Sequence, residues 1–139
     1  MTERHAVNVC LFVAVAYALM KLYFTVMWWF DGFDFWIHAG FRPLVSDDVG
    51  ALLGTKWIGT RNLGLGALLL GLVFGKKLRF IGMLLIMGVI VEFFDGFWLA
   101  HARLQGWVAG NGTFYMIGAF VWVPVLILCG RYLLKKADR

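Results

Sequence analysis

The stretch that decides the fold is residues 78–100, which read LRFIGMLLIMGVIVEFFDGFWLA. As a helix rising about 1.5 Å per residue, this run is long enough to cross a hydrocarbon layer of about 30 Å. It nevertheless carries two acids, Glu92 and Asp95, which lie three residues apart and share a helical face with Gly88. A charge inside a membrane is costly, so such a residue normally faces a partner, water or a ligand.

Three further apolar runs flank this one, at about residues 6–30, 51–74 and 113–134. None of them alternates between apolar and polar residues, so helices are favoured over the strands of a barrel. The 139 residues are 62% hydrophobic and 15% charged, whereas a soluble domain is about 45–50% apolar and about 25% charged. A soluble domain of this size has too small a core to bury that excess of apolar residues. We therefore predict one all-α integral membrane domain over residues 1–139, built as a bundle of four transmembrane helices.

The positions of the basic residues predict the orientation of the bundle. Eight of them belong to one side: Arg4, Lys76, Lys77, Arg79, Arg131, Lys135, Lys136 and Arg139. The positive-inside rule then places both termini in the cytoplasm, and the net charge of +5 does not indicate nucleic acid as a partner. The first run is too long for a signal peptide and is followed by a poor cleavage site at residues 31–34, so we expect it in the mature protein.

Other patterns predict how the helices pack. Small residues share one face of the second run, which favours close approach of a helix from this chain or from another subunit; they are Thr60, Gly64, Ala67, Gly71 and Gly75. Cys10 and Cys129 are expected to be buried thiols and not a disulfide. Aromatic residues make the segment 33–41 amphipathic, and it is expected to lie on the membrane interface.

Two basic residues complete the set of buried charges: Lys21 in the first run and Arg61 in the second. From the helical rise, Lys21, Arg61 and Glu92 should lie about 12–15 Å below the outer membrane edge, with Asp95 nearer that edge. Two positive and two negative charges at similar depth can neutralise one another. A guanidinium can hold a carboxylate through two hydrogen bonds, so we expect Arg61 to pair with Glu92 or Asp95.

Residues near these charges are candidates for the same site. Tyr17 lies one turn before Lys21 on the same helical face, and Asn62 follows Arg61. His101 does not share the face of Asp95 but can reach the mouth of a pocket, and Trp122 lies deep enough to line one. Asp34 and His38 are spaced to share a metal ion, yet residues in a wet loop are usually solvated, and we predict no metal site.

The charged cluster allows several functions. The first is a binding or accessory protein whose polar pocket, in the outer half of the bundle, holds a lipophilic molecule with a polar end, such as a quinone or lipid fragment. Arg61 and Lys21 then contact the polar end, and Glu92 and Asp95 orient these cations. The second is an intramembrane isomerase or hydrolase in which Glu92 or Asp95 is the general acid or base. The third is a small oligomeric transporter coupled to protons or cations.

A fourth interpretation is that the charged residues only stabilise the bundle and have no binding or catalytic role. The expected partners are membrane lipid, a lipophilic small molecule, and a membrane protein or further copies of the chain. The sequence identifies no cofactor, and it leaves open whether the chain is an enzyme.

Two short motifs carry a resemblance to a known group. The stretch at residues 59–66, GTRNLGLG, opens the second run, and the acidic pair Glu92 and Asp95 lies late in the third. With the four-helix layout, these resemble the DoxX-like group of small bacterial membrane proteins. The resemblance implies a multi-pass protein of the bacterial inner (cytoplasmic) membrane, in some cases an accessory subunit of a redox system. The chain is also faintly similar to sterol-isomerase-type membrane enzymes, but it lacks their fifth helix.

Overall fold

The computed structural model describes residues 3–31, 49–106 and 111–138 as helices and short turns. The elements are α1 (Glu3–Val26), the π-helical turn η1 (Met27–Asp31), α3 (Val49–Phe74), α4 (Leu78–Leu104) and α5 (Asn111–Ala137). Each of the four long elements contains a stretch long and apolar enough to cross a membrane. The predicted all-helical fold with four membrane-spanning helices is confirmed. The expected interfacial segment at residues 33–41, with Asp34 and His38, lies outside the described residues.

The helix α4 continues past residue 100, where the apolar run was expected to end. It reaches Leu104 and stops at Gly106, whose positive φ of 73° is a left-handed conformation that glycine adopts without strain. The N–H of Gly106 donates to the carbonyl of Arg103 at 3.0 Å, as in a helix C-cap. Hydropathy alone misses this last turn because a helix can extend beyond the hydrocarbon layer, where its polar residues are hydrated.

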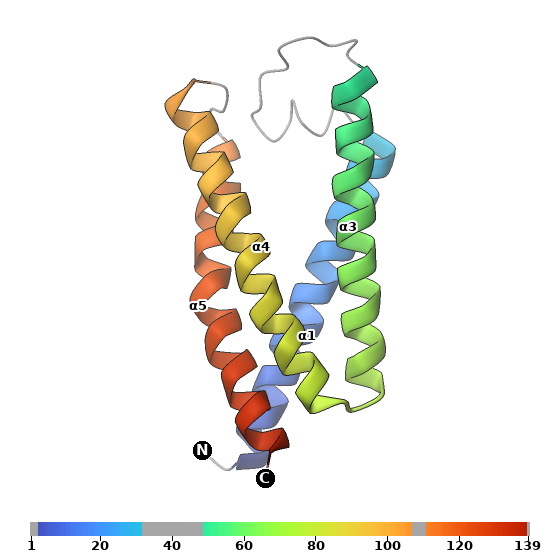
Figure 1. The fold of residues 1–139 in the computed structure, drawn as a ribbon, viewed down its shortest axis with the longest axis vertical. Helices are drawn as coiled ribbons and strands as arrows, with labels where there is room; N and C mark the ends of the chain where they lie inside the picture. Colours follow the sequence, from blue (N-terminus) through green and yellow to red (C-terminus); the bar gives the residue numbers. More distant parts are fainter. Residues whose placement is uncertain (1–2, 32–48, 107–110, 139) are drawn as a thin grey trace.

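The four helices form two adjacent pairs, α1 with α3 and α4 with α5 (Figure 1). Both termini lie at one end of the bundle, beside the tight turn that joins α3 to α4. At this end Lys136 forms an ion pair of 2.6 Å with Glu3. An even number of crossings places both termini on the same side of the membrane; that this side is the cytoplasm stays a prediction from the distribution of positive charge.

The contact between α1 and α5 follows a seven-residue repeat. Three contacts join the two helices at equal steps: Glu3 with Lys136, Cys10 with Cys129, and Tyr17 with Trp122. Such a repeat is typical of antiparallel helices that pack along a narrow seam at a small crossing angle. Both cysteines are buried and free, as expected, and their thiols lie within hydrogen-bonding range of each other.

The helices α4 and α5 approach most closely at two glycines. A Cβ atom on Gly82 would lie 2.9 Å from the carbonyl oxygen of Gly130, and one on Gly130 would lie 3.0 Å from that of Gly82. Neither position has room for a side chain, because backbone atoms of the facing helix and the side chains of Ile86 and Leu134 occupy the space. Small residues of this kind let membrane helices approach where no hydrophobic driving force holds them together.

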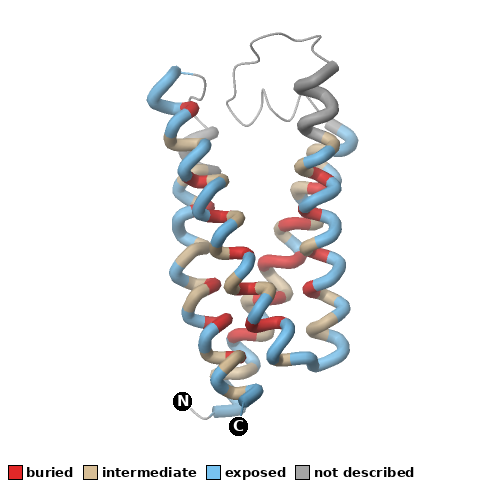
Figure 2. The backbone as a smooth tube through the Cα atoms, viewed as in Figure 1, coloured by how far each residue is buried: buried red, intermediate tan, exposed pale blue. Residues whose placement is uncertain are grey.

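The face of α3 that was expected to pack closely does not contact another helix within the described residues. Thr60, Gly64, Ala67 and Gly71 are exposed, and no atom of a neighbouring element lies within 4 Å of a Cβ built on Gly64 or Gly71. The helix instead turns Gly59 and Gly66 toward α1, where the buried Asn62 also lies. Figure 2 shows the exposed positions along its outward side. Packing of the small-residue face against another subunit stays a prediction.

Candidate functional site

The most deeply buried charges form an ion pair between α1 and α4. The ammonium group of Lys21 contacts Oε1 of Glu92, and the two side chains are only 4% and 5% exposed. The phenol of Tyr17 donates a hydrogen bond of 2.8 Å to the same carboxylate oxygen. Two partners from one face of α1 thus compensate a carboxylate that would otherwise be very costly to bury.

The ring of Tyr17 is held in place from two sides. On one side it lies against Trp122 of α5, with ring centroids 5.3 Å apart. On the other side it covers Gly88 of α4, where an added Cβ atom would lie 3.0 Å from the phenol oxygen. The glycine one turn before Glu92 therefore leaves the space that brings the phenol to the carboxylate, as its shared face with the acids suggested.

A second ion pair joins α3 to α4. The guanidinium of Arg61 donates two hydrogen bonds to the carboxylate of Asp95, at 2.9 and 3.4 Å. The side chains are 40% and 35% exposed, unlike the buried pair beside them. The expectation that Arg61 binds an acid of α4 through both nitrogens is confirmed, and the acid is Asp95. Because Asp95 follows Glu92 by about one turn, the same face of α4 meets α1 through one acid and α3 through the other.

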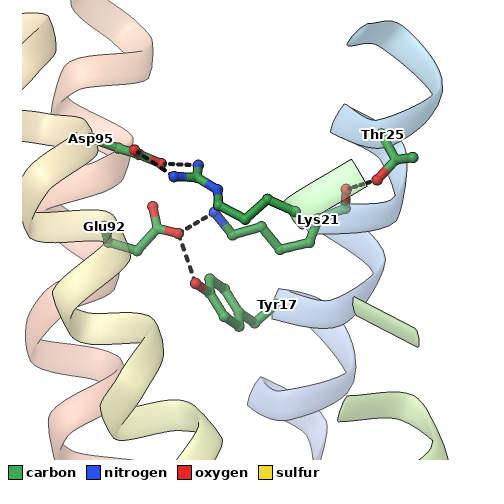
Figure 3. Close-up of polar contacts among 6 residues, drawn as sticks. Tyr17, Lys21, Thr25, Glu92 and Asp95 are labelled. Atoms are coloured by element: carbon green, nitrogen blue, oxygen red, sulfur yellow. Dashed lines mark hydrogen bonds and ion pairs between the residues drawn. The ribbon is translucent and has the colours of Figure 1, made fainter. Parts of the chain in front are cut away.

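The two ion pairs lie next to each other and form one network (Figure 3). The network contains two positive and two negative groups, so its formal charge is zero. By helical rise, Glu92 lies about 18 Å from the end of α4 at Leu104; its depth of about 12–15 Å below the membrane edge stays a prediction. Glu92 therefore lies near the middle of this helix, which runs from Leu78 to Leu104.

Beyond the two ion pairs, polar groups of α1 and α3 also meet. The hydroxyl of Thr25 donates to the carbonyl of Lys21 at 3.0 Å and lies 3.2 Å from the carbonyl of Gly59 on α3. Asn62, on the same face of α3 as Gly59, is only 3% exposed, and its Oδ1 has no hydrogen-bond partner among the described residues. Asn62 was expected at the site from its position after Arg61; nothing in the sequence indicates that its oxygen lacks a donor.

Not every predicted residue lies at the network. Tyr17, Lys21, Glu92 and Trp122 gather around the buried pair, and Arg61 and Asp95 form the exposed one. His101 lies about 9 Å farther along α4 than Asp95 by helical rise. It is exposed, and its ring lies edge-on to that of Trp98 with centroids 5.8 Å apart. The roles assigned to these residues in binding or catalysis stay predictions.

The donor set of the network suits organic polar groups better than a metal ion. In the described parts of the chain, no three side chains of His, Cys, Asp or Glu gather as a metal site requires. Both carboxylates already bind cationic side chains, while the half-exposed guanidinium presents N–H donors. The arrangement can therefore bind an uncharged or anionic oxygen within the bundle.

Comparison of the chain with models of known protein families, with curated proteins and with solved structures found no match. The resemblance to the DoxX-like group therefore stays an expectation from two short motifs, and the arguments about function rest on the geometry of the network.

Proposed function

We propose that this membrane protein binds a lipophilic molecule and holds its polar end against the Arg61–Asp95 ion pair. The observation that carries the proposal is the exposure of this pair, 40% and 35%, near the middle of helices that span the membrane. Hydrocarbon tails cannot solvate such groups, and the free energy cost favours a polar partner at this position. A lipophilic molecule with a polar end can reach the pair from within the bilayer.

The chemistry of Arg61 indicates which part of the molecule it would bind. A guanidinium has five N–H donors, and the hydrogen bonds to Asp95 use only part of them. The remaining donors suit an acceptor oxygen, such as the carbonyl of a quinone or a polar group of a lipid fragment. Asp95 fixes the plane of the guanidinium, so the donors are oriented before the ligand arrives.

The buried pair has a positioning role in this proposal. Lys21 is almost fully buried and its ammonium group binds Glu92, so Arg61 is the more accessible of the two cations. The contact between Lys21 and Glu92 fixes α4 against α1, and with it the position of Asp95 one turn farther along. Lys21 therefore acts on the ligand through the helix and not by direct contact.

Replacing Arg61 with alanine is expected to remove the bound lipophile. The wild-type chain and the Arg61→Ala variant would be purified in a mild detergent, and their organic extracts compared by mass spectrometry. We expect the extracted ligand to fall about tenfold or more, because a hydrogen bond to a charged group contributes about 1.5–3 kcal/mol. Arg61→Lys should retain part of it, since the charge stays but the paired donors are lost.

The matched control is Lys136→Ala, which breaks an ion pair at the terminal end of the bundle. This variant should retain the ligand in full. Equal amounts of ligand in the wild-type chain and in Arg61→Ala, with both folded, would contradict the proposal.

A further inference from the structure

The buried amide of Asn62 is an unusual feature of this bundle. The residue is 3% exposed, and its Oδ1 accepts no hydrogen bond within the described residues. A buried carbonyl without a donor destabilises a protein, and inside a membrane no bulk water is present to compensate it. Leucine has nearly the same size and would avoid this cost. The amide thus lowers the stability of the bundle unless a donor from outside the described residues binds to it.

The register of α1 and α3 locates this amide. The hydroxyl of Thr25 meets the carbonyl of Gly59 at 3.2 Å, and farther along a Cβ on Gly66 would lie 2.9 Å from the carbonyl of Ala18. The two helices are antiparallel, so Asn62, between the two glycines, lies level with residues 21 and 22 of α1. It therefore lies at the depth of the Lys21–Glu92 pair.

Within the described part of the chain, two consecutive residues of α3 carry a free donor and a free acceptor. Arg61 presents N–H donors beside Asp95, and the next residue, Asn62, presents an oxygen without a donor on the inward side of the helix. A quinone carbonyl or an ether only accepts hydrogen bonds, so it would satisfy Arg61 and leave the oxygen of Asn62 unpaired. A hydroxyl group both donates and accepts. It can therefore hydrogen-bond to the amide of Asn62 whether the oxygen or the nitrogen of that amide faces it.

We propose that Asn62 selects ligands whose polar end carries a hydroxyl group, such as a phenol, a hydroquinone or a lipid alcohol. This inference rests on the function proposed above and narrows the class of ligand. The hydroxyl donates its proton to Oδ1 of Asn62, and an oxygen of the same polar end accepts from Arg61. Sites that hydrogen-bond a ligand hydroxyl discriminate strongly against analogues that lack it, because the buried polar group is then left unpaired.

A matched pair of probes tests the selection of hydroxyl groups: 4-nonylphenol and its methyl ether, 4-nonylanisole, which differ in one O–H group. Calorimetric titration into the purified full chain in detergent micelles gives the two affinities. The wild-type chain should bind the phenol about tenfold more tightly than the ether, and Asn62→Leu should bind both about equally. The control Asn8→Leu changes an exposed amide of α1 and should keep the wild-type preference.

The unfolding temperature of Asn62→Leu provides an independent readout. Without ligand it should equal or exceed that of the wild-type chain, because the substitution removes an unpaired buried group. A clear decrease would mean that a structural water already satisfies the amide, and would overturn the inference. An equal affinity of the wild-type chain for phenol and ether would overturn it as well.

The Arg61→Ala variant separates this inference from the function on which it rests. If the wild-type chain does not distinguish the probes but Arg61→Ala weakens both, Asn62 has no selective role and the proposed function stands. If Arg61→Ala binds the probes as well as the wild-type chain does, or if neither probe binds the wild-type chain, the proposed function is contradicted and the inference fails with it.

Discussion

Replacing Lys21 with methionine is expected to destabilise the bundle by about 3–5 kcal/mol, the cost of leaving a buried charge without its partner. Methionine fills a similar volume but cannot compensate Glu92, which is only 5% exposed on its side chain. Tyr17 would remain as a donor to the same oxygen, and a neutral phenol does not replace a positive charge. The free energy of unfolding, measured by denaturant titration in mixed micelles, gives the size of the effect.

A second substitution distinguishes charge from packing. Adding Glu92→Gln to Lys21→Met removes the uncompensated charge, so the double variant should regain much of the lost stability. The control Lys136→Met breaks the ion pair with Glu3, whose side chains are 32% and 63% exposed, and should cost at most about 1 kcal/mol. If the double variant were as unstable as Lys21→Met, packing and not charge would account for the loss.

Placing leucine at Gly82 is expected to separate α4 from α5 and to destabilise the chain by about 3 kcal/mol or more. An added Cβ atom would lie 2.9 Å from the carbonyl oxygen of Gly130, and a backbone atom cannot move aside as a side chain does. Overpacking of this kind typically costs about 1–3 kcal/mol, and the larger side chain and the rigid neighbour place this site at the upper end. Unfolding in mixed micelles again provides the measurement.

The matched control is leucine at Gly71 of α3, where no atom of a neighbouring element lies within 4 Å of a built Cβ. Gly71→Leu should leave the stability of the monomer unchanged or raise it, because glycine is the weaker helix former by up to about 1 kcal/mol. Equal destabilisation by Gly82→Leu and Gly71→Leu would show that the close contact between α4 and α5 is not where the structure places it.

The number and approximate limits of the helices could be predicted because the membrane imposes them. A hydrocarbon layer of about 30 Å fixes the length of each apolar run, and the backbone must satisfy its own hydrogen bonds within that layer. The same constraint marks Lys21, Arg61, Glu92 and Asp95 as residues that need partners. The observed helices extend a few residues beyond the predicted runs at several ends, as in the last turn of α4 beyond residue 100.

The choice of partners required the structure. Glu92 and Asp95 share one face of α4. The sequence does not show where α1 and α3 lie around that face. Which acid faces α1 and which faces α3 depends on the rotation of α4 about its own axis. The half-exposed state of Arg61 and the missing donor at Asn62 likewise depend on the neighbours of each side chain, which are far away in the sequence.

The small-residue face of α3 does not pack against another helix within the described residues, for a related reason. Small residues show where a helix can approach, and several faces of α3 qualify. The contact between Gly82 and Gly130 joins one glycine of α4 to one glycine of α5. A single glycine on each helix does not form a repeated pattern of small residues. The face of α3 that lies against α1, where Asn62 is buried, follows from the arrangement of all four helices.

The central claim is that Lys21 and Glu92 meet inside the bundle, and solid-state NMR in lipid bilayers can measure this contact directly. Glu3 and Glu92 are the two glutamates of the chain, so a Glu3→Gln variant carrying ¹³Cδ-glutamate and ¹⁵Nζ-lysine reports on Glu92 alone. The account predicts strong dipolar dephasing of the Glu92 carboxyl carbon by a lysine nitrogen at ion-pair distance, and its loss on Lys21→Met. Absence of dephasing before that substitution would contradict the account.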